Sequence, residues 1–151
     1  AYNQAKNTLA DANAKVQESD YEAAKSAAVQ AKSQADQAKS LAESEKARIR
    51  DEAQAIVGRV SNAIGDARAA VDGAPRGKGA DGDLDQLRAD LGQAEASVSS
   101  ARSSLGSGSF SAALEQAKSG ESKLSKVQSA VQVAMQKIDD WKMKNRPWYE
   151  L

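Results

Sequence analysis

The segment that most resembles a chemical motif is the glycine-rich sequence GAPRGKG at residues 73–79. A glycine followed by lysine is typical of phosphate-binding loops, in which GxxxxGK[ST] joins a strand to a helix. Here the spacing is one residue short, Gly79 stands where the hydroxyl residue should be, and a long helical pattern precedes the loop. We therefore interpret the segment as a flexible linker between helices, with nucleotide binding as the alternative.

Three acids follow that loop at alternate positions, Asp81, Asp83 and Asp85, as do the first ligands of a calcium-binding loop. An EF-hand starting at Asp81 would need Gly at its sixth position and Glu at its twelfth. Gln86 and Gly92 occupy those positions. We therefore expect Asp83 to cap the next helix and Asp85 to interact with its dipole, with a weak Ca²⁺ site as the alternative.

The C-terminal sequence WKMKNRPWYEL concentrates aromatic and basic residues in a chain that is only 4% aromatic. Trp141 continues the preceding apolar stripe, so we assign it to the core. Trp148, Tyr149 and Leu151 lie beyond the end of the last predicted helix. They could fold back on the protein, insert into a neighbouring subunit, or serve as a recognition tail.

Residues 43–52, ESEKARIRDE, alternate opposite charges at helical spacing, for example Glu43 with Lys46 and Glu45 with Arg48. Such a pattern is typical of the solvated face of a long helix, and a docking surface for a partner is the alternative.

Composition excludes most catalytic chemistry. The chain has 151 residues and 15.9 kDa, with 21 basic and 21 acidic side chains and neither His nor Cys. Imidazole bases, thiolate nucleophiles and the usual zinc ligands are therefore missing, and we expect a protein that is not an enzyme and needs no metal or cofactor. A net charge of zero gives no reason to expect nucleic acid as a partner. No apolar run is long enough for a transmembrane helix. No signal peptide is recognisable, and a start at Ala1 indicates a processed or trimmed chain.

Apolar residues recur every three or four positions throughout, which predicts an all-α fold. The stripe of Ala5, Leu9, Ala12 and Val16 marks a first helix, and Ser19 followed by Glu22 predicts a capping box for the second. We expect a single elongated domain over residues 1–151. Its helices would span about residues 3–17, 20–72, 83–105 and 109–144, with a loop at 73–82 and a tail at 146–151.

An internal repeat relates the first helix and turn to a later part of the chain. Residues 89 positions apart have similar types, as in Ala5 and Ala94, Leu9 and Val98, or Tyr21 and Phe110. In each copy an aromatic residue opens the second helix and alanines follow, as in Tyr21, Ala24 and Ala28. A ring at this position could cover the end of the preceding helix, and the alanines would let the two backbones approach closely.

This pattern of turn, aromatic residue and alanines, over roughly residues 5–40 and 94–140, resembles the Ala-rich helical hairpins of a domain family of unknown function found in bacterial cell-envelope lipoproteins. It is similar, more distantly, to the second helix of tetratricopeptide repeats. The chain departs from the first family in lacking a lipidated Cys, and from the second in lacking a 34-residue period. The resemblance to the first family implies an extracytoplasmic scaffold or binding module, periplasmic or secreted, and carries over no functional residue.

These observations predict four helices arranged as two antiparallel hairpins that share one long helix. The third and fourth helices would form a three-helix bundle with the second half of the long helix, leaving an N-terminal hairpin that protrudes or is covered by a partner. We expect a structural or interaction module that assembles with copies of itself or with an envelope protein. A ligand- or protein-binding module that uses the aromatic tail is the alternative. The predicted interaction residues are Tyr21, Ala24, Ala28, Ala31, Ala35, Trp148, Tyr149 and Leu151.

Overall fold

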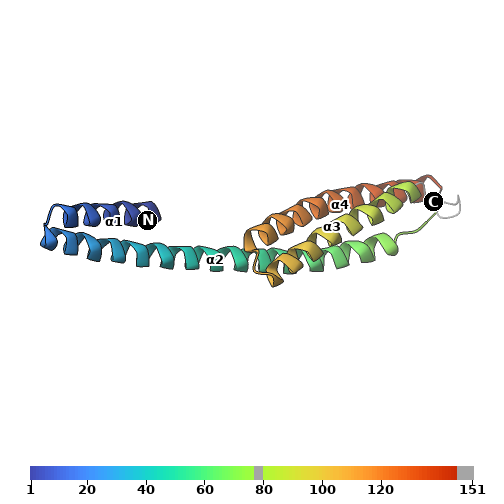
Figure 1. Ribbon diagram of the computed structural model, residues 1–151. Coiled ribbons are helices and arrows are strands. Elements are labelled where there is room, and N and C mark those ends of the chain that lie inside the picture. The colour runs from blue at the N-terminus through green and yellow to red at the C-terminus, as the bar shows by residue number, and fades with distance from the viewer. Residues whose placement is uncertain (77–79, 146–151) are drawn as a thin grey trace. The chain divides into compact units, whose positions relative to one another are not determined.

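The computed structural model describes residues 1–76 and 80–145. Its helices are α1 (Tyr2–Gln17), α2 (Tyr21–Asp72), α3 (Asp81–Gly106) and α4 (Phe110–Lys144) (Figure 1). No strand occurs in the described residues, so the predicted all-α class is confirmed. The observed helix ends lie within two residues of the predicted ones.

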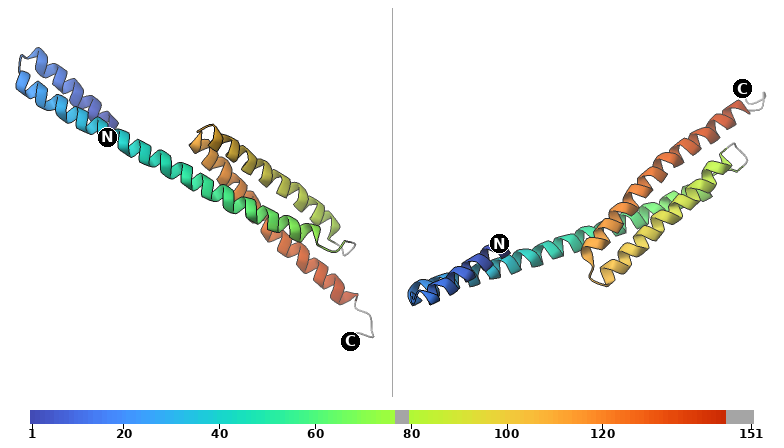
Figure 2. Two further views of the ribbon diagram at one scale, coloured as in Figure 1. Left: turned by 90° about the horizontal axis from the view of Figure 1, so that it is seen from below. Right: turned by 45° about the horizontal axis from the view of Figure 1, so that its top comes forward.

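The chain divides into two compact units, Ala1–Arg48 and Ile49–Leu151, and α2 contributes residues to both. The first unit is an antiparallel hairpin of α1 and the beginning of α2. The second unit is a bundle in which α3 and α4 pack against residues 49–72 of α2 (Figure 2).

Alanine forms nearly all of the buried surface in the hairpin. The buried residues are Ala5 and Ala12 of α1 and Ala24, Ala27 and Ala31 of α2. Between these alanines, the Thr8 hydroxyl donates a hydrogen bond of 2.9 Å to the Gln34 side-chain oxygen. Small side chains let the two helix backbones approach closely, but each removes little apolar area from water.

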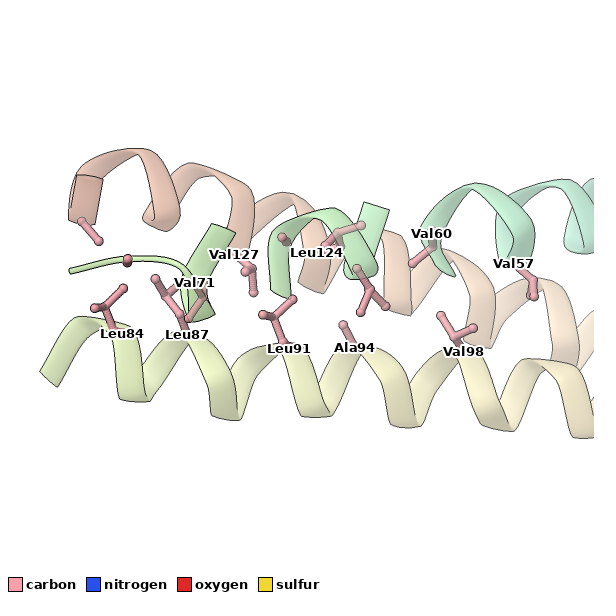
Figure 3. Close-up of a cluster of buried hydrophobic side chains, with 14 of the residues drawn as sticks. Val57, Val60, Val71, Leu84, Leu87, Leu91, Ala94, Val98, Leu124 and Val127 are labelled. Carbon is pink, nitrogen blue, oxygen red and sulfur yellow. The ribbon is translucent and has the colours of Figure 1, made fainter. Parts of the chain in front are cut away.

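The second unit has the larger core. Leucine, isoleucine and valine side chains from all three helices meet along the axis of the bundle (Figure 3). Gly120 of α4 packs closely against α3, since a Cβ placed on it would lie 3.2 Å from Cγ2 of Val98. Salt bridges flank this core: Arg59 to Glu121 at 2.5 Å, Arg68 to Glu95 at 2.8 Å, and Lys118 to Glu52 at 2.8 Å.

The two interhelix turns have the same backbone structure, which confirms that the sequence repeat is also structural. In the first turn the amides of Glu18, Ser19 and Asp20 bond to carbonyls of Ala14, Val16 and Lys15. In the second turn the same three bonds recur at positions 89 residues later, from Ser107, Gly108 and Ser109. The middle residue has a left-handed conformation in both turns, with φ of 62° at Ser19 and 77° at Gly108.

Two predicted helix caps are wrong. The left-handed Ser19 does not cap α2; instead Asp20 Oδ1 accepts a bond of 3.1 Å from the amide of Ala23. Similarly, Asp83 does not cap α3, because that helix already begins at Asp81 and places Asp83 in its first turn. The Asp83 carboxylate instead lies 2.6 Å from Nζ of Lys137 on α4.

Candidate functional site

The contact between α1 and α2 does not use the stripe predicted for α1. Ala5 and Ala12 are buried as expected, but Leu9 and Val16 remain 52% and 48% exposed. The residues beside the buried alanines are the partly buried Thr8 and Lys15. Leu9 and Val16 each lie four residues after a buried alanine, so they point to one side of the contact rather than into it.

Exposed apolar residues recur every seventh position along both helices of the hairpin. In α1 they are Tyr2, Leu9 and Val16; in α2 they are Tyr21, Ala28, Ala35 and Ala42. In both helices the series is rotated in the same direction around the helix axis from the buried alanines. Because the helices are antiparallel, this displacement brings both series to the same side of the hairpin. We call this set of seven residues the hairpin face.

Tyr2 and Tyr21 are 73% and 67% exposed, so the face presents large rings as well as aliphatic side chains to solvent. Tyr21 therefore does not cover the end of the preceding helix in the way that the sequence suggested. Single exposed apolar residues are ordinary on protein surfaces, whereas a regular series along two adjacent helices is typical of an interaction surface.

The predicted interaction residues fall into three groups. Tyr21, Ala28 and Ala35 lie on the hairpin face, whereas Ala24 and Ala31 are buried between α1 and α2. Trp148, Tyr149 and Leu151 lie outside the described residues. Sequence reasoning missed Tyr2, Leu9 and Val16 as exposed members of the face, although their seven-residue spacing could have indicated it.

The second unit shows the same seven positions covered. The equivalents 89 residues later are all apolar, and all are buried or partly buried: Leu91, Val98, Leu105, Phe110, Ala117, Leu124 and Val131. Leu91 is 1% exposed and Val98 is 3% exposed. Val57, Val60, Ile64 and Val71 of α2 belong to the same core cluster, and Figure 3 shows α2 valines directed toward the α3 side chains. Residues of α2 thus cover in the second hairpin six of the seven positions that stay exposed in the first.

Lysines border the hairpin face. Lys6 of α1 and Lys25, Lys32 and Lys39 of α2 each follow a position that packs toward the other helix, and all four are exposed. Asp11 of α1, Glu18 just after it and Glu22 of α2 lie away from this border, whereas Asp36 follows Lys32 by four residues and Glu43 pairs with Lys39 at 4.0 Å. The lysines lie nearer to the apolar face around each helix than these acids do.

The acids at the start of α3 make ion pairs with neighbouring side chains. Asp83 pairs with Lys137 at 2.6 Å and Asp85 with Arg88 at 2.8 Å. Among the described residues no group of three or more acidic side chains is placed to hold a metal ion. Of the glycine-rich loop, residues 77–79 lie outside the described part of the chain.

A groove of about 420 Å³ lies between α2 and α3 in the second unit. Its polar lining is mutually bonded: Arg68 pairs with Glu95, and Arg102 donates to the Ser61 hydroxyl at 2.7 Å. These bonds join α2 to α3 across the groove.

The charged stretch at residues 43–52 contains the predicted Glu45–Arg48 pair at 2.6 Å. The hydrogen bond from Arg48 holds the pKa of the Glu45 carboxyl below its ordinary value of 4.5. Both side chains remain more than half exposed, which agrees with a solvated helix surface.

Comparisons with protein-family models, with curated proteins and with solved structures find no match. No helix in the described part of the chain is both long and apolar enough to cross a membrane.

Proposed function

We propose that this protein is a non-enzymatic interaction module that binds another polypeptide through the hairpin face. The observation that carries the proposal is the difference between the two hairpins: seven equivalent apolar positions are exposed in the first and buried or partly buried in the second, where six of them belong to or pack against the core cluster shared with α2. Burying them would remove Tyr2, Leu9, Val16 and Tyr21 from water at about 25 cal/mol per Å² of apolar area. The alanines between them would admit a helix at short distance.

The resemblance to hairpins of cell-envelope lipoproteins supports a scaffold role in the bacterial envelope or outside the cell. We propose this location together with the interaction function. The partner is a protein chain, either another copy or a different envelope protein.

The test uses three forms of the full chain: wild type, Leu9→Gln with Val16→Gln, and Ala10→Gln with Ala14→Gln. The first variant removes two apolar side chains from the face. The second is a matched control, because Ala10 and Ala14 are exposed on the same helix but point away from the face. Circular dichroism should show equal helix content in all three, since no buried residue changes.

Two measurements are made on each form. Light scattering over a wide concentration range reports self-association. Fluorescence polarisation reports binding of two labelled peptides: residues 49–72 of this chain, and the same peptide with Arg59→Glu and Arg68→Glu. Association or peptide binding that is lost in the face variant and kept in the control supports the function. A constant mass of 15.9 kDa together with no binding of either peptide would overturn it.

A further inference from the structure

The second unit indicates what kind of molecule fits the hairpin face. There the equivalent face is covered by residues 49–72 of α2, whose apolar positions include Ile56, Val60, Ile64 and Val71. The two hairpins share the same turn, a polar pair at the same positions, and small buried residues at four equivalent positions: Ala5 and Ala94, Ala12 and Ala101, Ala24 and Ala113, Ala31 and Gly120. Thr8 bonds to Gln34 in one, and the equivalent Lys123 bonds to Ser97 in the other. A covering helix with the same apolar spacing therefore matches the first hairpin as well.

The charges beside the two faces are opposite. In the second unit Glu95 and Glu121 receive Arg68 and Arg59 of the covering helix. The residues 89 positions earlier are Lys6 and Lys32, both exposed. Each carboxylate that pairs with the covering helix is thus replaced by an ammonium group in the first hairpin.

From this reversal we infer that the hairpin face binds an amphipathic helix of a second protein, with carboxylates where α2 carries Arg59 and Arg68. Those carboxylates lie nine residues apart, and apolar residues occupy the positions of Val60, Ile64 and Ala67 between them. The inference rests on the proposed function and specifies the partner that the face selects.

A second copy of this chain fits less well, for electrostatic reasons. Its residues 49–72 would place Arg59 beside Lys32 and Arg68 beside Lys6, and like charges across an interface weaken the complex. Two hairpin faces packed on each other would bring their lysine borders together, and the acids Asp36 and Glu43 lie farther from the apolar residues than the lysines do. A helix with acids at both positions removes both conflicts.

The experiment measures how charge on each side controls peptide affinity. The two peptides of residues 49–72, with Arg59 and Arg68 or with both changed to Glu, are titrated with the full chain. Four chains are used: wild type, Lys6→Glu with Lys32→Glu, Lys126→Glu with Lys144→Glu, and the face variant Leu9→Gln with Val16→Gln. Lys126 and Lys144 are exposed in the second unit, so that variant changes net charge equally without altering the hairpin.

We expect wild type to bind the glutamate peptide about tenfold more tightly than the arginine peptide at low salt, with the ratio falling as salt is added. The Lys6→Glu and Lys32→Glu chain should reverse this preference, the Lys126 and Lys144 variant should keep it, and the face variant should bind neither peptide.

Each other outcome has a distinct meaning. Equal affinity for both peptides, unchanged in the lysine variant, would overturn the charge-selected partner while leaving the proposed function intact. Failure of both peptides to bind, with a monomeric mass, would overturn the function itself. Self-association lost in the face variant would identify a second copy as the occupant and overturn the inference. Binding to phosphatidylglycerol vesicles through the face, without peptide binding, would overturn it in favour of an anionic lipid surface.

Discussion

The exposure of the hairpin face can be tested by comparing two leucines from the equivalent apolar series of the two hairpins, Leu9 in the series of α1 and Leu91 in that of α3. Leu91 in α3 is 1% exposed, whereas Leu9 in α1 is 52% exposed. Both lie on the side of their hairpin that a covering helix would occupy, but only Leu91 is covered. Truncation to alanine should therefore have very different costs at the two sites.

For Leu91→Ala we expect a loss of about 2–5 kcal/mol in unfolding free energy, because a buried leucine leaves a cavity. For Leu9→Ala we expect less than about 1 kcal/mol, since half of the side chain is already in water and alanine has the higher helix propensity. Urea denaturation of the full chain, followed by circular dichroism at 222 nm, measures both values. Each unit is fitted with its own transition if two appear.

Val29→Ala serves as the control, because Val29 is 64% exposed and should change stability by no more than about 0.5 kcal/mol. A loss at Leu9 as large as that at Leu91, at low micromolar concentration, would refute the reasoning. It would mean that the hairpin face is covered in solution.

Three further changes test the fold and its electrostatics. Gly120→Leu should lower the free energy of unfolding, measured by urea denaturation, by about 1–3 kcal/mol, because a side chain there overlaps Val98. Gly65→Ala, in an open part of α2, should raise it by about 0.5–1 kcal/mol. Equal effects of the two substitutions would contradict the packing of Gly120 against α3. Asp20→Ala should lower the melting temperature by removing the α2 cap, at about 0.5–2 kcal/mol, and no change would rule out that cap. The Glu45 carboxyl, followed by NMR, should titrate below its ordinary pKa and return toward it in an Arg48→Gln chain; its pairing contributes at pH values above the unfolded pKa and is lost as pH falls through the folded pKa.

The fold class and the helix ends were accessible from the sequence because apolar periodicity and turn residues report directly on local structure. The residues that cap the helices were harder to predict from the sequence. Ser19 and Glu22 have the spacing of a capping box, but the repeated turn requires a left-handed residue at position 19 and so transfers capping to Asp20. Glycine at the equivalent position 108 was the available clue.

The face of α1 could not be chosen from spacing alone. Ala5, Leu9, Ala12 and Val16 have helical periodicity, and so do Ala5, Thr8, Ala12 and Lys15. The structure selects the second set because α2 presents alanines at short distance, and a leucine between the helices would force them apart. Spacing alone also could not separate buried from exposed residues among the predicted interaction residues of α2. Ala24 and Ala28 lie on adjacent positions of one helix surface, and only Ala28 is exposed.

Under the proposed function, the sequence differences between the two hairpins account for one hairpin packing on its own helix and the other binding a helix of a partner. Four of the five buried alanines of the first hairpin have alanine or glycine at the equivalent position of the second, as at Ala12 and Ala101, and these small residues let the helices pack closely. Positions toward the covering helix stay apolar, which preserves the ability to bind a helix. The bordering residues instead change sign, from Glu95 to Lys6 and from Glu121 to Lys32. In the proposed interaction, residues 49–72 of a neighbouring copy would place two arginines against Lys6 and Lys32. These two like-charge contacts would disfavour that copy while the apolar residues stay available, so under this proposal the border discriminates between partners and the apolar residues supply the affinity.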